Sequence, residues 1–312
     1  MTQINPRSQT FKTRDASSYD FVTDEFDRFT DRLSPPLAAQ MIYLAQLAPS
    51  NWVLDVGTGT GLVALQAAQE VGPNGKVLGI DLSDGMLDTA RAKALRAGLT
   101  NCVEFLKMDA EALELEDCTF DVVLSLFALL HFPNPLTALE EMFRVLRHRG
   151  KLVLAVGSGP PTLSLTGFVH RVRRLSKILL KLQGKQLTAP GFLNSLLEKY
   201  FPEPDEPEET LLARESLNRT RSVLALVRRA GFAKVRSYWE GHQASLATPE
   251  EYWDLQRTFS SIARKRLSSA PLEKVNALQE EFLETCRKVQ SRGGRLVYPF
   301  AAFYVTAQRP PA

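Results

Sequence analysis

The stretch VLDVGTGTGLVALQAA, residues 53–68, constrains the fold of this chain more than any other. It places an apolar run directly before three glycines, Gly57, Gly59 and Gly61, and a helical pattern directly after them. Glycine permits positive φ angles and leaves the backbone N–H groups accessible, because it has no Cβ atom. A strand that turns through such a loop into a helix is typical of a doubly wound α/β sheet, in which ligands bind at the carboxyl ends of the strands.

Short apolar runs then alternate with longer helical patterns as far as residue 157. Helical periodicity over 62–71, 85–97 and 135–146 separates the runs, with Ser83 as a plausible N-cap and Gly98 as a plausible stop of the second helix. Strands joined by such crossovers form a mostly parallel sheet with helices on both faces. The predicted strands are 52–56, 76–80, 103–108, 120–125 and 151–156, followed later by 232–240 and the antiparallel 295–307.

The fold class is therefore α/β, a Rossmann-like sheet of seven strands with a helical cap formed by insertions. The chain is long for one domain, so one domain with insertions is the first expectation. The expected division is 1–157 for the N-terminal helices and ligand-binding core, 158–215 for an inserted helical cap, 216–240 for a return to the core, 241–294 for a second helical excursion, and 295–312 for the last strand.

Composition excludes several classes of protein. The net charge of +3 gives no argument for nucleic acid. The three cysteines are too few and too widely spaced for a disulfide framework or a zinc site, so we expect a reducing cytoplasmic location and no metal. The polar N-terminus lacks the apolar region of a signal peptide, and no stretch approaches the roughly 20 apolar residues of an integral membrane segment.

The glycine loop predicts a site for an anionic group, which the N-terminus of the following helix favours. The dinucleotide fingerprint would need a third glycine where Leu62 stands, so the match to NAD is imperfect. Asp81 ends the second strand, where an acidic side chain accepts hydrogen bonds from ribose hydroxyls. Asp109 and Glu111 follow the third strand, where a carboxylate can accept from the exocyclic amine of adenine.

Five segments in register resemble the class I S-adenosylmethionine-dependent methyltransferases, particularly the small-molecule branch that includes the ubiquinone/menaquinone biosynthesis type. They are VLDVGTGTG, GID with Ser83 and Met86 behind it, KMDAEAL, FDVVLSLFALLHFPNPLTALEEMFRVL and GKLVLAV. The resemblance covers roughly residues 20–157 and implies S-adenosylmethionine as cofactor and S-adenosylhomocysteine as product. The cofactor-binding residues it implies are Asp55, Gly57, Thr58, Gly59, Gly61, Asp81, Leu82, Met86, Asp109, Ala110, Ser125, Tyr19 and Thr30.

The stretch YDFVTDEFDRFTDRLS, residues 19–34, resembles the leading helix of that family. In this helix an aromatic residue near Tyr19 or Phe29 and a hydroxyl such as Thr30 would close over the cofactor. The methyl group on a sulfonium is already electrophilic, so the protein mainly has to hold a nucleophile in line with it. His131, just past the fourth strand, is the candidate general base, although a histidine there can equally orient a loop or line the cofactor pocket.

The segment after the fourth strand constrains the acceptor. The residues Ser125 to Ala128 do not resemble the motif of amide- and adenine-N-methylating relatives, and the acidic metal ligands of catechol O-methyltransferases have no counterpart. A small, apolar or aromatic metabolite methylated on oxygen or carbon is favoured. The later aromatic residues either line its pocket or form ordinary core; they are Phe192, Tyr200, Phe201, Tyr252, Trp253, Phe259, Tyr298 and Phe300.

The segment 168–185 has an apolar stripe surrounded by arginine and lysine, without an acidic residue. It predicts either peripheral contact with an anionic membrane or a lid that packs on the core. Two other interpretations of the chain stay open, a nicotinamide-dependent oxidoreductase and a non-catalytic S-adenosylmethionine-binding protein. The oligomeric state is not indicated by the sequence.

Overall fold

The computed structural model describes residues 6–157, 186–188, 191–201, 220–268 and 270–312. Three helices precede the sheet: α1 (Pro6–Asp20), α2 (Thr23–Leu33) and α3 (Pro35–Ala45). The leading helix expected over 19–34 is thus two helices, because the chain turns at 21–22, where the N–H of Val22 donates to the carbonyl of Tyr19. Tyr19 therefore lies at the end of α1, whereas Thr30 lies within α2.

Parallel strands and crossover helices then alternate as the sequence predicts, with no helix among the described residues between the third and fourth strands. The helices are α4 (Leu62–Val71), α5 (Asp84–Arg96) and α6 (Pro135–Val145), with a short 3₁₀ helix η1 (Leu129–His131) after the fourth strand. The strands are β1 (Trp52–Val56), β2 (Lys76–Asp81), β3 (Val103–Lys107), β4 (Phe120–Leu126) and β5 (Leu146–Val156). Ser83 caps α5 by accepting from the N–H of Met86, and Gly98 follows the helix with a φ of 68°, so both predicted ends are confirmed.

The predicted seven-stranded, mostly parallel sheet is confirmed, and one short strand adds to it. The order is β3-β2-β1-β4-β5-β8-β6, with β7 (Ala233–Leu246) paired to β8 (Arg295–Gln308). Strand β8 is antiparallel to both β5 and β7 and lies between them. The eighth strand, β6 (Gln186–Thr188), was not predicted because three residues carry too little periodicity to recognise.

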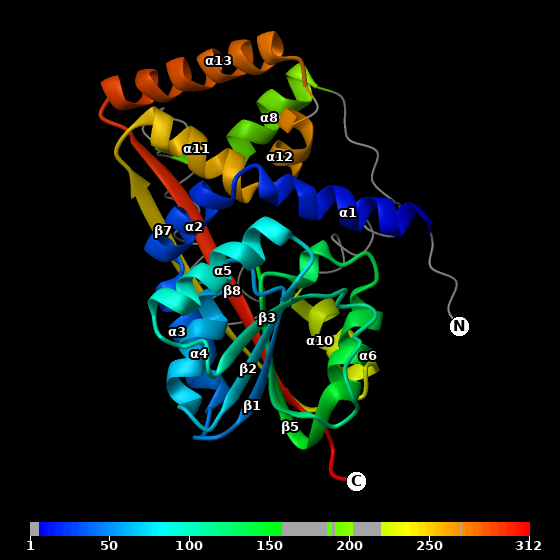
Figure 1. Cartoon of the computed structure of the whole chain (residues 1–312). Coiled ribbons are helices and arrows are strands. Elements are labelled where there is room, and N and C mark those ends of the chain that lie inside the picture. The colour runs from blue at the N-terminus through cyan, green and yellow to red at the C-terminus, as the bar shows by residue number, and fades with distance from the viewer. Residues whose placement is uncertain (1–5, 158–185, 189–190, 202–219, 269) are drawn as a thin grey trace.

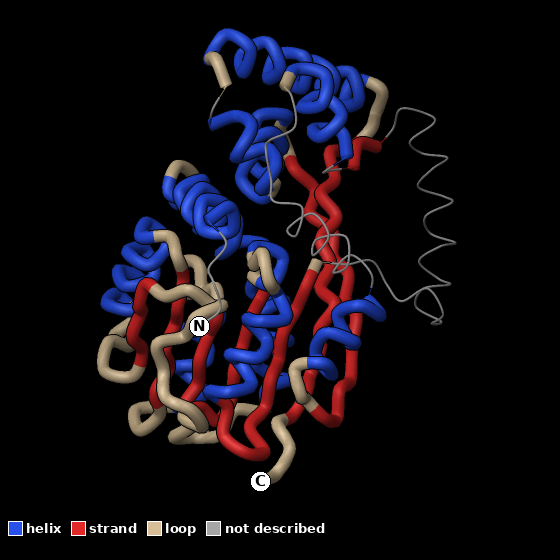
Figure 2. The backbone as a smooth tube through the Cα atoms, turned by 90° about the vertical axis from the view of Figure 1, so that its right-hand side faces the viewer, coloured by secondary structure: helices blue, strands red, loops and turns tan. Residues whose placement is uncertain are grey.

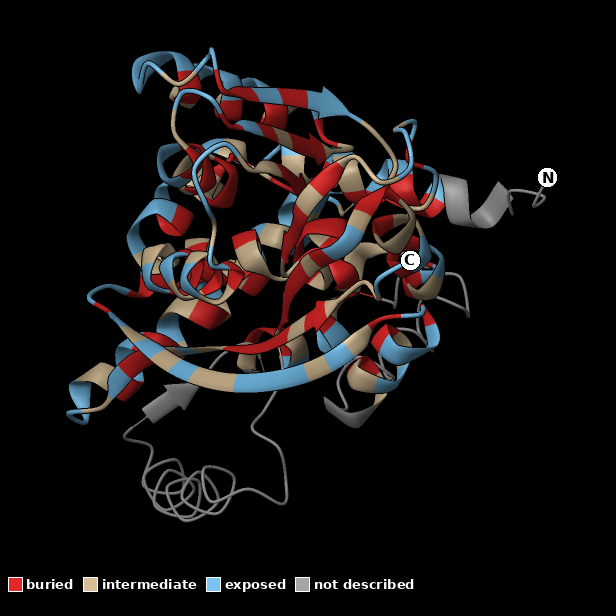
Figure 3. Ribbon diagram, turned by 90° about the horizontal axis from the view of Figure 1, so that it is seen from below, coloured by how far each residue is buried: buried red, intermediate tan, exposed pale blue. Residues whose placement is uncertain are grey.

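Helices cover both faces of the sheet because β1 alternates its side chains between two apolar clusters. Leu54 and Val56 pack into the first cluster with α6 and α10 (Thr220–Arg229), whereas Val53 packs into the second with α3, α4 and α5. Figure 3 shows the buried residues concentrated on the strands and on the inward faces of these helices.

Four further helices pack together around a third apolar cluster: α8 (Gly191–Tyr200), α11 (Pro249–Phe259), α12 (Ser261–Ser268) and α13 (Leu272–Ser291). We call this layer the cap. It stands apart from the sheet's helices, with α1 lying between it and the strands (Figures 1 and 2). Of the eight aromatic residues named from 192 onward, seven pack into this cluster and Phe300 packs with the sheet.

The basic segment 168–185 lies outside the described residues, as does most of the expected insertion 158–215. Within the part of the chain that the structure describes, no helix is both long and apolar enough to cross a membrane.

Candidate cofactor and acceptor site

The glycine loop joins β1 to α4 and passes close to the segment that follows β4. Gly57, Gly59 and Gly61 have φ angles of 72°, 54° and 83°, a region that other residues rarely adopt. A Cβ atom placed on Gly57 would lie 2.2 Å from the Cβ of Ala128. The first glycine is therefore required both by its backbone conformation and by its neighbour.

Asp55 and Thr58 stabilise the loop from within. The Thr58 hydroxyl donates to Oδ2 of Asp55 at 2.7 Å, and Asp55 is buried. Burial raises the pKa of Asp55 to about 7. Both residues were expected to bind the cofactor, and the structure places them beneath the loop, where they fix its conformation.

Asp81, at the end of β2, connects the loop to the start of α5. Its Oδ2 accepts the N–H of Gly59 at 2.9 Å, and its Oδ1 accepts the N–H groups of Leu82 and Ser83 at 2.8 and 3.1 Å. A carboxylate offers about four acceptor positions, so Oδ2 keeps capacity for a ribose hydroxyl. Burial raises the pKa of Asp81.

Two hydroxyls beside the loop are buried without a hydrogen-bond partner among the described residues. They belong to Thr60, in the loop, and to Ser125, near the end of β4. Buried polar groups are almost always paired, so such hydroxyls mark the place of a polar ligand. With the bare loop and Asp81, they fit the expected cofactor, S-adenosylmethionine.

Helix α1 covers the residues expected to hold adenine. Lys12 is almost fully buried, and its Nζ lies 2.8 Å from Oδ2 of Asp109 and 2.7 Å from Oε2 of Glu111. The N–H of Glu111 also donates to Oδ1 of Asp109 at 2.9 Å. The sequence contains no signal for Lys12, because a lysine on a polar helix normally faces solvent.

His131 lies at the centre of a hydrogen-bonded chain that joins η1 to α1. Its Nδ1 is 2.8 Å from Oδ2 of Asp15, and its Nε2 is 3.1 Å from the hydroxyl of Tyr19. The Nζ of Lys265 lies 2.8 Å from Oδ1 of Asp15. Burial alone would raise the pKa of Asp15, but His131 and Lys265 outweigh it and hold that pKa below its ordinary value.

Because an ionised carboxylate only accepts hydrogen bonds, Nδ1 of His131 carries the proton when the ring is neutral. Its Nε2 then accepts from Tyr19, whose pKa is raised to about 12 by burial. The charge of Asp81 also raises the pKa of Tyr19, and the charge of His131 lowers that of Asp81. This hydrogen-bonded chain therefore lies within electrostatic reach of Asp81, which is predicted to bind the cofactor's ribose.

The remaining predicted residues are spread around this centre. Leu82 contributes its N–H to Asp81, Met86 is buried in the first turn of α5, and Ala110 is buried after β3. Thr30 is buried on α2, and its hydroxyl makes no hydrogen bond to the described part of the chain. Sequence reasoning missed Lys12, Asp15, Lys265 and Arg264, which come from segments with no motif.

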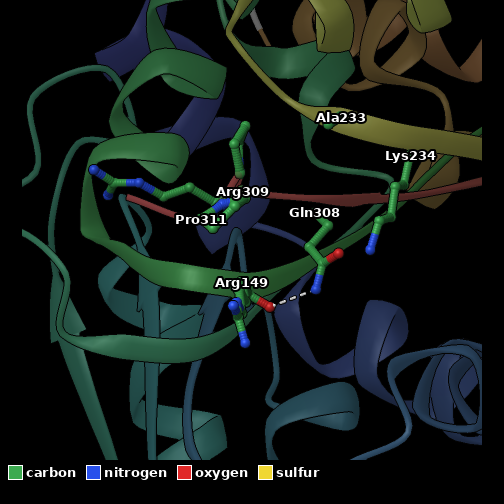
Figure 4. A pocket seen from close by; sticks show the side chains of 7 residues that line it. Arg149, Ala233, Lys234, Gln308, Arg309 and Pro311 are labelled. Carbon is green, nitrogen blue, oxygen red and sulfur yellow. Dashed lines mark hydrogen bonds between the residues drawn. The ribbon is translucent and has the colours of Figure 1, made fainter.

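A separate cavity of about 410 Å³ lies at the opposite edge of the sheet, where β5 begins and β8 ends. Figure 4 shows the side chain of Gln308 donating to the carbonyl of Arg149 at its rim. The guanidinium of Arg309 donates hydrogen bonds to three backbone carbonyl groups near the end of α6. The cavity is thus remote from the glycine loop.

The core of the chain matches a known family. Residues 53–150 match the model described as a methyltransferase domain. The demethylmenaquinone methyltransferase of Lactococcus lactis subsp. lactis (strain IL1403) is 36% identical over 159 residues, which cover 50% of this chain and 62% of the relative. The aklanonic acid methyltransferase DauC of Streptomyces sp. (strain C5) is 28% identical over 146 residues, covering 47% of this chain and 66% of the relative.

These matches span less than two thirds of either relative's length. A solved structure of a putative methyltransferase from Bacillus halodurans C-125 superposes with a TM-score of 0.52 at 22% identity, covering 88% of this chain and 98% of that one. This similarity extends the common fold beyond the matched core. Residues 53–150 are thus similar to a methyltransferase domain, and the solved structure has the same fold over most of this chain.

Proposed function

We propose that this chain transfers a methyl group from S-adenosylmethionine to an oxygen or carbon atom of a small, apolar or aromatic acceptor. The observation that carries the proposal is the glycine loop, tied through the Gly59 N–H to Asp81 and lying within electrostatic reach of the Asp15–His131–Tyr19 chain. The names of the two relatives, a demethylmenaquinone and an aklanonic acid methyltransferase, support a small-molecule acceptor.

The cofactor, when bound, supplies a methyl group already activated by its positive sulfur. The loop N–H groups and the N-terminus of α4 would hold its carboxylate. The free acceptor position on Asp81 would hold a ribose hydroxyl, and Asp109 would face the adenine amine. The ion pairs of Lys12 with Asp109 and Glu111 hold α1 over this end of the site.

The acceptor's proton leaves through the Tyr19 hydroxyl to Nε2 of His131. Tyr19 gives its own proton to His131 as it accepts that of the acceptor, so it ends the step unchanged. Asp15 fixes the orientation of the imidazole ring and stabilises the imidazolium that forms. The ring contacts of Tyr19 with Phe26 and His131, at 5.5 and 5.6 Å between centroids, hold its hydroxyl in place.

The cap is proposed to cover the acceptor, with 158–215 and 241–294 as its two contributions and 216–240 and 295–312 as parts of the core. Its apolar cluster and the burial of Tyr252 and Trp253 support an apolar environment above the site. A reducing compartment such as the cytoplasm fits the three cysteines, which are free.

The first test is thermal melting with S-adenosylhomocysteine, NAD and NADP. A ligand at about 100 times its dissociation constant stabilises by about 2.7 kcal/mol, which corresponds to a shift on the order of 5 to 10 °C for a chain near this size. A shift with S-adenosylhomocysteine alone supports the proposal. A shift only with a nicotinamide cofactor contradicts it and supports an oxidoreductase.

The second test replaces His131 by alanine and follows methyl transfer to an acceptor found by screening. The rate should fall about 100-fold or more, with a changed pH profile, because the acceptor loses its base. His148→Ala is the matched control, since His148 is exposed at the opposite edge of the sheet. Equal rates for the two variants would refute the assigned role of His131.

A further inference from the structure

Arg264, on α12, is a buried cation with an unused donor. The residue is buried, with only 4% of its surface exposed to solvent. Its Nε donates to the Ser18 hydroxyl at 3.3 Å, and its Nη1 donates to the carbonyl of Thr258. Its Nη2 has no hydrogen-bond partner within the described ranges.

Among the described residues, no carboxylate pairs with this guanidinium. Asp15, the acid of the same cluster, is already engaged by His131 on one oxygen and by Lys265 on the other. A buried charge without a partner is costly, so it is retained where something else supplies the opposite charge.

The position of Arg264 points to the acceptor as the source of that charge. Its guanidinium lies over the ring of Tyr19, 3.7 Å from the centroid, and Tyr19 contacts His131. Its charge also acts on Tyr298, which packs against Phe259 at 6.0 Å between ring centroids. Arg264 thus lies where the aromatic residues of the cap meet the polar chain beside the cofactor site.

We propose that Arg264 binds an anionic oxygen of the acceptor, either a carboxylate or an ionised phenol or enol, through its free Nη2. The acceptor is then an apolar or aromatic acid, and its neutral analogues bind weakly. This inference rests on the proposed methyl transfer and names the substrate class of the same site. Arg264 also contacts the ring of Tyr19, so it positions the Tyr19 hydroxyl for proton transfer to His131.

The test measures binding to the chain saturated with S-adenosylhomocysteine, by calorimetry. The probes are 2-naphthoate against 2-naphthamide, which has the same shape without the charge, and 4-nitrophenol above and below its own pKa. A charge-assisted hydrogen bond should favour the anionic form about 10- to 100-fold. A preference for naphthoate alone identifies a carboxylate, and a preference for nitrophenolate alone identifies an ionised phenol.

Arg264→Gln should abolish this preference in protein that still binds S-adenosylhomocysteine. The matched control is Arg257→Gln on α11, because Arg257 already pairs with Glu25 and Asp254 and should not affect the preference. Arg264→Lys keeps the charge but not the planar fork, so it should retain only part of the preference.

The wild-type comparison decides the question even if Arg264→Gln does not fold. The proposal is overturned if the wild type prefers neither anion over its neutral form, or if Arg264→Gln folds and keeps the full preference. A variant that loses stability without any change in charge preference assigns Arg264 a purely structural role. Failure of the wild type to bind S-adenosylhomocysteine refutes the proposed methyl transfer instead, which separates the two failures.

Discussion

Replacing Gly57 by alanine tests how tightly the glycine loop packs against the segment that carries His131. The new methyl group would point at Ala128, which immediately precedes η1. Two costs arise from the structure, one from the backbone conformation and one from the contact. A second glycine separates them, because Gly98 has nearly the same φ angle and open space around it.

The backbone cost is that of holding alanine in the left-handed region, about 1–2 kcal/mol, because φ at Gly57 is 72°. The contact cost comes from the 2.2 Å separation of the two Cβ atoms, far inside the usual contact of about 3.5–4.0 Å. Forcing an extra carbon into a packed site costs about 1–3 kcal/mol. Gly57→Ala should therefore lower the free energy of unfolding by about 2–5 kcal/mol.

Gly98→Ala should cost only the backbone part, about 1–2 kcal/mol, since nothing lies within 4 Å of its Cβ position at a φ of 68°. Urea denaturation of both variants gives the difference directly, and calorimetry gives their affinity for S-adenosylhomocysteine. Only Gly57→Ala should weaken that affinity. If both variants lose the same stability, the loop does not pack on Ala128 and the reasoning is refuted.

Three further outcomes are expected from changes at single residues. Asp81→Ala should raise the dissociation constant of S-adenosylhomocysteine about 10- to 100-fold, because a ribose hydroxyl loses a charged acceptor; an unchanged constant in calorimetry would contradict this. The pKa of Asp55 is raised from 3.8 to about 7, so folding favours its protonated form. The resulting contribution to the free energy of unfolding is about 4 kcal/mol at most. It is fully present below pH 3.8 and is lost as the pH rises to about 7. Asp55→Asn should flatten the dependence of the urea midpoint on pH across that window, and an equal slope in both proteins would exclude the assignment. Phe282→Ala should cost about 3–5 kcal/mol, because the ring is fully buried in the cap, and a loss below about 1 kcal/mol by the same denaturation would show that the cap core relaxes around it.

The parts of the fold that depend on local sequence could be predicted. The alternation of side chains in β1 and the capping of α5 by Ser83 are properties of a few neighbouring residues. They indicated the seven strands, the crossover helices and the position of the glycine loop. The division of the leading segment at 21–22 and the three-residue strand β6 were missed, because a turn without glycine or proline and a very short strand leave little periodicity.

The cofactor side of the site depends on the same local signals. Asp81 ends a strand, and parallel strands bring their carboxyl ends to one edge of the sheet. The list of implied cofactor-binding residues does not separate those that would face the ligand from those that support the loop. Asp55 accepts from the Thr58 hydroxyl, whereas Asp81 accepts from the Gly59 N–H, and only the structure shows this difference.

The sequence by itself determined the sheet, the loop and the cofactor class, because strand alternation, helix periodicity and the conformational freedom of glycine act between near neighbours. Only the tertiary structure decided which residues meet at the proposed acceptor side. Asp15 and Tyr19 reach His131 across more than a hundred residues of chain, and Arg264 reaches Tyr19 from the cap. The sequence around a polar residue on an amphipathic helix does not indicate its partner, because packing between distant helices decides whether the residue faces water or a buried carboxylate.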